Sequence, residues 1–408
     1  MAKLINLKVF KDFFQSTSSG GILLLICVVI SLTIANTSLG PGFESLLNTE
    51  FGFSTESLHL RYPLLLWIND GLMAIFFLFV GLEIKREVIE GELSSLRQAA
   101  LPVLAAIGGV LVPALIYTAF NSDNPETIHG WGIPMATDIA FALGILSLLG
   151  NRVPAALKIF LAALAIVDDL MAILVIAIFY TTSLHLSYLM YAGGIFALLI
   201  AFNRFGIKNI FFYIIPGIFM WYFIHHSGIH ATIAGVLTAL TLPTTIDDVE
   251  SPLEKLEHAL AKPVNFLIMP IFAIANTNIT FESGMVEGLV SNLGFGIVLG
   301  LFLGKPIGIF AMSWLSVKLK IAELPGEAKW MHVLGLGLLG GIGFTMSIFI
   351  ALLSFKSPML QTEAKFAVLT ASILSGVAGY LLLSMYNGRK YKEDVMEELK
   401  DNDQHPKA

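Results

Sequence analysis

Long stretches of apolar residues recur along almost the whole chain, and they constrain its fold more than any other feature. Many of them approach or exceed the roughly 20 residues that an α-helix needs to cross a bilayer. Only 13% of the 408 residues are charged and 56% are hydrophobic, whereas about 25% of the residues of a soluble globular domain are charged. The mean hydropathy is +0.80. These values are typical of an all-α protein that crosses a membrane many times.

Twelve membrane-spanning helices are predicted from the apolar stretches. They cover residues 17–36, 64–88, 99–120, 126–149, 155–181, 187–203, 209–225, 228–243, 252–280, 293–317, 331–354 and 362–385. The first follows a basic N-terminus without a convincing cleavage site, so we interpret it as a spanning helix and not as a signal peptide. The chain is thereby divided into an N-terminal segment (1–16), a membrane domain (17–386) and a charged tail (387–408).

The basic residues indicate how such a protein lies in the membrane. Twelve spans place both termini on one side, and this side carries 20 of the 24 lysine and arginine residues. The opposite side carries Arg61, Lys356 and Lys365, and Lys305 lies within a span. Because short cytoplasmic loops are rich in lysine and arginine, we expect both termini to lie in the cytoplasm.

A polar connection at 44–62 separates the first two predicted helices. Part of it alternates between polar and apolar residues and is rich in Thr, Ser and aromatic residues, which predicts an extracytoplasmic β-hairpin. The exposed edge of such a hairpin can pair with another protomer. The single cysteine, Cys27, excludes an internal disulfide.

Two of the predicted helices are interrupted. Glycine and proline residues break the helix at 126–149, and five glycines break the helix at 331–354. Each is the second member of a three-helix run, and the two runs have opposite orientation because one starts inside and the other outside. Paired interrupted spans in inverted repeats indicate the substrate site of a transporter. The ends of the half-helices need compensating charges, and Asp138 and Lys305 have the appropriate signs.

Two adjacent carboxylates, Asp168 and Asp169, lie near the middle of the apolar segment 161–177. A charged residue at this depth costs roughly 2.5–3.5 kcal/mol on insertion scales, so it indicates a functional site. Neighbouring residues on a helix point about 100° apart, which lets one carboxylate face water while the other faces a neighbouring helix. Carboxylate oxygens bind hard cations and also protons, so the pair can exchange one for the other, and its titration would belong to both residues.

Lys305 is the only basic residue deep within a predicted span, so it needs an acidic partner. Asp168 is the first candidate and Asp138 the second. Lys305 either forms a static ion pair or loses a proton during transport, since buried lysines titrate readily. Thr137 and Asp138 either help to hold an ion or only neutralise the helix ends.

Charged residues also gather at two helix ends on the predicted cytoplasmic side. They are Glu83, Lys85, Arg86 and Glu87 at the end of 64–88, and Glu254, Glu257 and His258 at the start of 252–280. These residues form either ordinary solvated helix ends or a titrating cluster that responds to pH.

Three histidines lie on the opposite side. His226 and His230 are spaced like ligands of a metal ion, but the sequence supplies no further ligands beside them, so we do not expect a metal site. Asp70 lies near the outer end of the helix at 64–88. It either caps a helix or joins a polar network.

Five sequence motifs together resemble the NhaA family of bacterial sodium/proton antiporters. They are GLEIKRE at 81–87, TDIAFALGIL at 137–146, LAIVDDL at 164–170, HATIAGV at 230–236 and GKPIGI at 304–309. Each motif alone is modest evidence, but five in order with twelve predicted spans are highly specific. The resemblance covers residues 10–386, and this family is a known example of inverted repeats.

The resemblance implies an electrogenic antiporter of the bacterial inner membrane that exports Na⁺ or Li⁺ in exchange for protons by alternating access. It requires no cofactor, and no nucleic acid partner is expected. Asp168 and Asp169 would form the ion site, while Asp138 and Lys305 would balance the crossed, interrupted helices. The segment 44–62 would join two protomers into a homodimer.

The same resemblance implies a pH-responsive region. Its residues would be Glu83, Arg86, Glu87, Glu257 and His258. One position departs from the family pattern, because Ala261 stands where the best-known members have a second histidine. This difference concerns the detailed pH response and not the transport chemistry.

Three other functions are less compatible with these residues. A proton-coupled transporter of a small organic anion would use Lys305 to bind its substrate, but the spans offer few aromatic or basic residues for such a pocket. An intramembrane aspartyl protease would leave Asp169 and Lys305 without a role, and its GxGD motif is absent from the sequence. A passive channel would not need titratable pairs at this depth.

Overall fold

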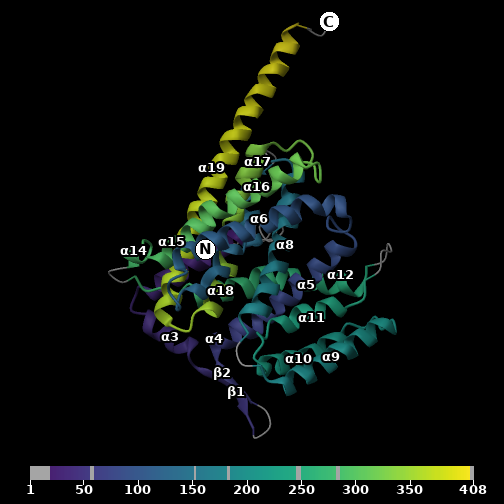
Figure 1. Cartoon of the computed structure of the whole chain (residues 1–408), viewed down its shortest axis with the longest axis vertical. Coiled ribbons are helices and arrows are strands. Elements are labelled where there is room, and N and C mark those ends of the chain that lie inside the picture. Colours follow the sequence, from purple (N-terminus) through teal and green to yellow (C-terminus); the bar gives the residue numbers. More distant parts are fainter. Residues whose placement is uncertain are drawn as a thin grey trace, which may run out of the picture.

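The computed structural model describes residues 19–55, 59–150, 153–181, 184–244, 250–281 and 285–404, with side chains as far as residue 386. The predicted N-terminal segment 1–16 lies outside the described residues. Helices form most of the structure, as predicted, and the strands of the described part are β1 (Glu50–Ser54) and β2 (His59–Pro63) (Figure 1).

The helices follow one another along almost the whole of the described chain. The first half contains α2 (Ser19–Ala35), α3 (Gly40–Leu47), α4 (Leu64–Leu66), η1 (Trp67–Leu72), α5 (Met73–Ile89), α6 (Leu96–Asn121), η2 (Ile128–Met135), α7 (Ile139–Leu148), α8 (Ala155–Phe179) and α9 (Leu186–Arg204). The second half contains α10 (Phe211–Ser227), α11 (Ile233–Thr241), α12 (Pro252–Pro263), η4 (Val264–Ile268), α13 (Met269–Asn276), α14 (Met285–Gly288), α15 (Asn292–Leu299), η5 (Gly300–Gly304), α16 (Lys305–Lys318), α17 (Trp330–Gly340), α18 (Phe344–Ser354) and α19 (Pro358–Gln404).

Each of the twelve predicted spans contains helical structure, but not every one of these helices is long enough to cross a bilayer by itself. Eight helices of the described chain are long and apolar enough to span a bilayer, and up to ten if each of two bent pairs forms one span. The helices α10 and α11 have 17 and 9 residues, which makes them too short by this measure. The count of twelve therefore stays a prediction.

Two boundaries differ from the predictions. The helix α3 occupies the start of the polar segment 44–62, so the hairpin is shorter than that segment. The helix α19 continues to Gln404 and so includes much of the predicted tail. Glutamate and lysine are good helix formers, and after Gly388 no glycine or proline interrupts the helix before it ends.

Close backbone contact joins the first helices of the two three-helix runs. A Cβ atom at Gly108 of α6 would lie 2.2 Å from the Gly308 carbonyl oxygen, and one at Gly308 of α16 would lie 2.0 Å from the Gly108 carbonyl oxygen. Only glycine permits backbones to approach so closely. This pair fixes the contact between the two runs beside Lys305, which is the first residue of α16.

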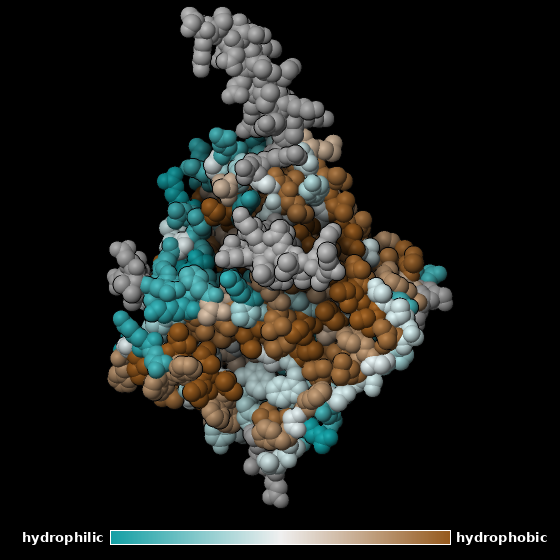
Figure 2. All heavy atoms as spheres, turned by 180° about the vertical axis from the view of Figure 1, so that it is seen from behind, coloured by the Kyte–Doolittle hydropathy of each residue, from teal (hydrophilic) through white to brown (hydrophobic). Residues whose placement is uncertain are grey.

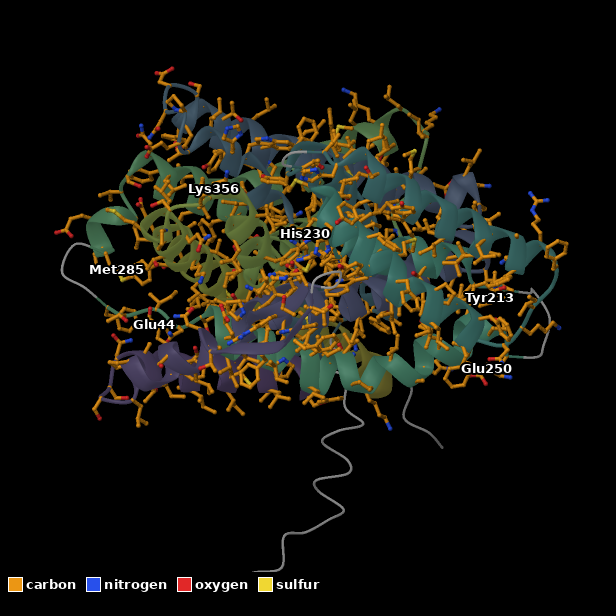
Figure 3. The ribbon with its side chains drawn as sticks, turned by 90° about the horizontal axis from the view of Figure 1, so that it is seen from below. Glu44, Tyr213, His230, Glu250, Met285 and Lys356 are labelled. Carbon is orange, nitrogen blue, oxygen red and sulfur yellow. The ribbon has the colours of Figure 1, made fainter. Side chains whose placement is uncertain are left out.

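The hairpin and the end of α19 extend from opposite ends of the molecule (Figure 1). In the hairpin, β1 and β2 pair in antiparallel register with Gly52 opposite Arg61. The view from below has His230 near the middle, with Tyr213 and Glu250 on one flank and Glu44 on the other (Figure 3).

The surface is apolar over wide areas. Figure 2 shows broad hydrophobic areas across the back of the molecule, with hydrophilic residues gathered on one flank and towards the end from which α19 extends. Large apolar side chains are exposed along α10, and those of Phe211 and Ile218 are 70% and 60% exposed. Such a surface is appropriate for contact with lipid chains.

Candidate functional site

The two interrupted helices meet at their breaks. Residues 136–138 separate η2 from α7, and residues 341–343 separate α17 from α18. The Asp138 backbone nitrogen donates a hydrogen bond of 2.7 Å to the Ile342 carbonyl oxygen. A Cβ atom at Gly341 would lie 2.4 Å from the Leu301 carbonyl oxygen, so the second break requires glycine. Four half-helix ends are therefore brought to one place.

Asp138 lies at the N-terminal ends of two of these half-helices. Its Oδ1 atom accepts a hydrogen bond of 3.0 Å from the Phe141 backbone nitrogen in the first turn of α7. Its Oδ2 atom accepts hydrogen bonds from the backbone nitrogen and hydroxyl of Thr345 in the first turn of α18. A carboxylate in this position compensates the positive ends of two helix dipoles.

Whereas Asp138 lies at the N-terminal ends of the half-helices, Lys305 lies at their C-terminal, carbonyl ends. Its Nζ atom is 2.6 Å from Asp168 Oδ2, and neither side chain is exposed. The same amine donates a hydrogen bond to the carbonyl oxygen of Met135, the last residue of η2. Of the two partners considered from the sequence, the structure therefore pairs Lys305 with Asp168.

Thr137 connects this ion pair to the second interrupted helix. Its hydroxyl lies 2.7 Å from Asp168 Oδ2 and 2.8 Å from the carbonyl oxygen of Gly340, the last residue of α17. The polar groups of both breaks are thus linked through Asp168.

Asp168 and Asp169 have different surroundings, as expected for neighbours on a helix. Asp168 contacts Lys305 and Thr137, whereas Asp169 lines a cavity of about 250 Å³ together with Glu83 and Asp138. Both aspartates are buried, and the Oδ1 atom of each has no hydrogen-bond partner in the described part of the chain. Such oxygens can accept either a proton or a cation.

The cavity is formed by segments that lie far apart in the sequence. Its wall comes from the start of α2 and from parts of α5, α7, α8, η4, α13 and α18. Polar groups on the wall are few, and Asn265 is one that the sequence analysis did not single out. It is a polar residue in a π-helical turn within a long apolar helix, and such turns often occur at functional sites.

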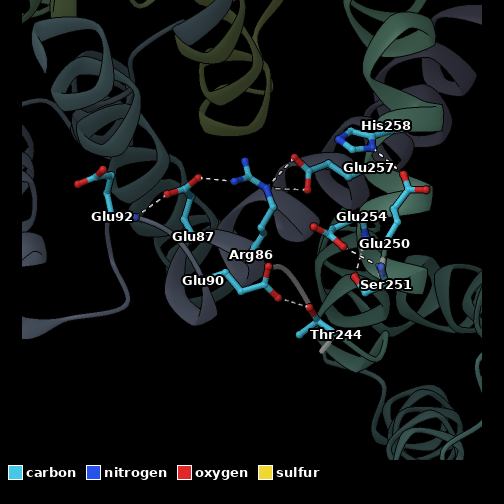
Figure 4. Close-up of polar contacts among 10 residues, drawn as sticks. All are labelled: Arg86, Glu87, Glu90, Glu92, Thr244, Glu250, Ser251, Glu254, Glu257 and His258. Atoms are coloured by element: carbon cyan, nitrogen blue, oxygen red, sulfur yellow. Dashed lines mark hydrogen bonds and ion pairs between the residues drawn. The ribbon is translucent and has the colours of Figure 1, made fainter. Parts of the chain in front are cut away.

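A cluster of charged side chains lies at the end of α5 (Figure 4). Arg86 Nε is 2.9 Å from Glu257 Oε2, and its Nη1 atom is 2.7 Å from Glu87 Oε1. Glu83 precedes Arg86 by one turn of α5 and faces the cavity that contains Asp169. Of the five residues predicted for a pH response, the structure therefore places Glu83 on the cavity wall and joins Arg86, Glu87 and Glu257 in one network.

The fifth of these residues, His258, follows Glu257 on α12 but pairs with a residue outside the Arg86 network. Its Nδ1 atom is 2.8 Å from Glu250 Oε1, and both side chains are largely exposed (Figure 4). Ala261 is partly buried and packs against the apolar core. Neither residue contacts Arg86 through a hydrogen bond or an ion pair that the structure contains in its described part.

The outer histidines belong to another cluster. Asp70 Oδ2 is 3.2 Å from His225 Nδ1, and Asp70 Oδ1 is 3.5 Å from His230 Nε2. His226 Nδ1 lies instead 2.9 Å from the Tyr222 carbonyl oxygen. Asp70 thus joins a polar network, which was one of the two roles left open by the sequence.

The sequence analysis also did not single out Thr345. It lies in the first turn of α18, just after the break of the second interrupted helix, whereas Thr137 lies within the break of the first. A threonine two residues after a glycine-rich interruption was the available signal, because its hydroxyl can bind a group in the break.

Comparisons with known proteins agree with this geometry. The family described as Na⁺/H⁺ antiporter 1 matches residues 11–383. The chain is 72% identical over 393 residues to Na(+)/H(+) antiporter NhaA 2 of Flavobacterium johnsoniae, covering 96% of each protein. It is 48% identical over 394 residues to Na(+)/H(+) antiporter NhaA of Caulobacter vibrioides, covering 95% of this chain and 94% of that protein.

A third relative extends the agreement. The chain is 50% identical over 374 residues to Na(+)/H(+) antiporter NhaA of Flavobacterium psychrophilum, covering 92% of this chain and 95% of that protein. The family matched covers nearly the whole chain, and it is a family of antiporters, which are transporters. This chain belongs to the Na⁺/H⁺ antiporter family known as NhaA.

Proposed function

We propose that the chain exports Na⁺ or Li⁺ from the bacterial cell in exchange for protons, and that Asp168 and Asp169 bind the exchanged ions. The observation that carries this proposal is the Asp169 carboxylate. It is buried, lines a cavity, and has an oxygen without a hydrogen-bond partner among the described residues. A buried carboxylate in this condition needs a proton or a cation to compensate its charge.

Exchange follows from competition for the same oxygens. A proton and a sodium ion cannot occupy one carboxylate oxygen together, so binding of the cation releases protons. If both aspartates release a proton for one monovalent cation, each cycle moves net charge, and the membrane voltage drives transport as well as the pH gradient. Alternating access at this site then delivers the ion to either side.

Three further residues support the exchange. Asp138 compensates the positive ends of α7 and α18, and Lys305 holds Asp168 next to the carbonyl end of η2. Thr137 offers a hydroxyl oxygen beside Asp168. Because hydroxyl and carboxylate oxygens suit a small hard cation, Thr137 and Asp138 complete the ion site when Na⁺ or Li⁺ is bound.

The charged cluster at the end of α5 regulates this transport according to pH. Glu83 lies on the cavity wall, and Arg86, Glu87 and Glu257 form one ion-pair network next to it. Protonation within this network changes the charge beside the cavity wall, and His258 adds an ionisable side chain next to Glu257. Ala261 contributes no titratable group.

The proposed orientation follows the distribution of basic residues, with both termini in the cytoplasm and the hairpin outside. The protein is a multi-pass protein of the inner membrane. The hairpin presents the exposed edges of β1 and β2, and edge pairing with a second copy gives a homodimer.

Proton flux in everted vesicles or proteoliposomes tests the proposal. A pH gradient is imposed, and Na⁺, Li⁺ and K⁺ are added in turn to the parent, to Asp169→Asn and to the exposed control Asp123→Asn. Na⁺ or Li⁺ should collapse the gradient with the parent and the control but not with Asp169→Asn. If no monovalent cation does so with the parent, from neutral to alkaline pH, the proposal is wrong.

The alternative of an organic-anion transporter makes a different prediction. It needs a free cation at the site, whereas the Lys305 amine already contacts Asp168 and the Met135 carbonyl. Collapse of the gradient by a small carboxylate in the absence of Na⁺ would favour this alternative.

A further inference from the structure

A second cavity, of about 620 Å³, lies away from the ion site. It is formed by the start of α6, the start of α8 and the loop after α16. Its apolar residues include Leu101, Pro102, Phe160 and Ala163. Its charged residues are Glu92, Arg97, Lys320 and Glu323. The cavity thus combines an apolar floor with charges of both signs.

The position of this cavity relative to the membrane follows from the helices around it. Three candidate spans, Leu96–Asn121, Ala155–Phe179 and Asn292–Lys318, each have one end beside it. At the end of α16, Lys318 Nζ lies 4.4 Å from the centre of the Trp314 ring. Tryptophan and lysine are typical of the boundary between lipid chains and water, so the cavity lies at the level of lipid headgroups.

Apolar side chains near the cavity are left exposed to the surroundings. Ile159 lines it with 48% of its surface exposed, and Ile321 lines it with 52% exposed. An apolar rim beside charged groups is appropriate for a molecule with a polar head and an apolar chain.

The charges are available to a ligand. Arg97 Nη2 is 2.9 Å from Glu323 Oε1, but both side chains are more than four-fifths exposed. Exposed pairs of this kind contribute little to stability, so they open at little cost. Two basic and two acidic side chains give no net charge, which favours a zwitterionic headgroup over an anionic one.

We propose that this cavity binds one phospholipid with a phosphoethanolamine headgroup. Arg97 and Lys320 hold the phosphate, because guanidinium and ammonium groups bind phosphate oxygens. Glu92 and Glu323 hold the ammonium group. One acyl chain lies along the apolar floor, which a soluble phosphate compound would not fill. The site does not depend on the ions that the protein exchanges.

Native mass spectrometry of the purified full-length protein tests this site. The protein receives equal amounts of phosphatidylethanolamine, phosphatidylglycerol and phosphatidylcholine with identical chains. The parent should retain phosphatidylethanolamine preferentially. The variant Arg97→Gln/Lys320→Gln should retain about fivefold less, as for the loss of a few exposed charge contacts. The matched control Lys255→Gln/Lys262→Gln removes two exposed charges of α12 and should behave like the parent.

The headgroup assignment has its own test. The variant Glu92→Gln/Glu323→Gln removes the partners of the ammonium group and leaves two cations, so it should prefer phosphatidylglycerol. The melting temperatures of all variants in detergent should stay close to that of the parent, because the substituted side chains lie at the surface. An unchanged preference in this variant, or equal retention by the arginine–lysine variant and the control, would overturn the proposal.

A competition experiment separates a lipid from a soluble ligand. Glycerophosphoethanolamine carries the headgroup without the acyl chains, so it should not displace the bound lipid at equal concentration. Complete displacement would mean that the cavity recognises a soluble phosphate compound, and the lipid assignment would then be wrong.

Discussion

Replacement of Lys305 by methionine should destabilise the protein strongly, and a second substitution should reverse most of the effect. Lys305 and Asp168 form a fully buried pair with 2.6 Å between Nζ and Oδ2. Breaking a buried pair by removing one partner costs about 3–5 kcal/mol of unfolding free energy, because the other charge is left uncompensated. Lys305→Met and Asp168→Asn should each show a loss of this size.

The double variant Lys305→Met/Asp168→Asn leaves no uncompensated charge. Its main remaining defect is the Met135 carbonyl oxygen, which loses the hydrogen bond from Lys305, and an unsatisfied buried group costs about 1–3 kcal/mol. The double variant should therefore be more stable than either single variant. It should still fail to exchange ions, because the Asp168 carboxylate is absent.

Unfolding in detergent, followed for the parent and the three variants under one condition, measures this cycle. Proton flux in proteoliposomes supplies the functional reading. If the loss in the double variant equals the sum of the single losses within about 0.5 kcal/mol, the residues do not interact. That result would refute the pairing and the reasoning built on it.

Three further predictions concern single positions. Asp169→Asn should abolish Na⁺-dependent proton flux but keep or raise the melting temperature, because it removes a buried charge with an unpartnered oxygen; a large loss of stability would contradict this. Arg86→Gln should shift the pH dependence of transport, since Glu257 loses its cation, and an unchanged pH profile would count against the cluster. Gly308→Ala should lower unfolding free energy by about 1–3 kcal/mol through overpacking against Gly108, whereas Gly193→Ala, which meets no neighbour, should not.

Hydropathy was enough to predict the helices, because a membrane protein must bury its backbone polar groups in helices wherever lipid surrounds it. The two interruptions were also predictable, since glycine and proline break helices irrespective of their neighbours. The pairing of Lys305 followed from the cost of a buried cation, but the choice of Asp168 over Asp138 depended on tertiary geometry.

Other features of the site had no comparable signal. The π-helical turns η1, η4 and η5 lie in ordinary apolar sequence, and packing rather than local preference decides where a helix widens by one residue. It was equally impossible to predict from the sequence that His258 does not contact Arg86, because an exposed side chain at a helix end has several possible partners. The charged residues of the sequence alone do not show which of them join Arg86 in one network and which pair elsewhere.

The arrangement of charges supports the proposal that Asp169 takes part in the exchange. The Asp138 carboxylate is compensated by the N-terminal ends of α7 and α18, and that of Asp168 by Lys305. Each of these two carboxylates therefore has a partner within the protein beside the breaks of the interrupted helices. The carboxylate of Asp169 lines the cavity, and its Oδ1 atom has no such partner among the described residues. In the proposed exchange, a mobile ion compensates Asp169 without disturbing the scaffold, while Asp168 takes part through its own unpartnered Oδ1 atom and keeps its contact with Lys305 through Oδ2.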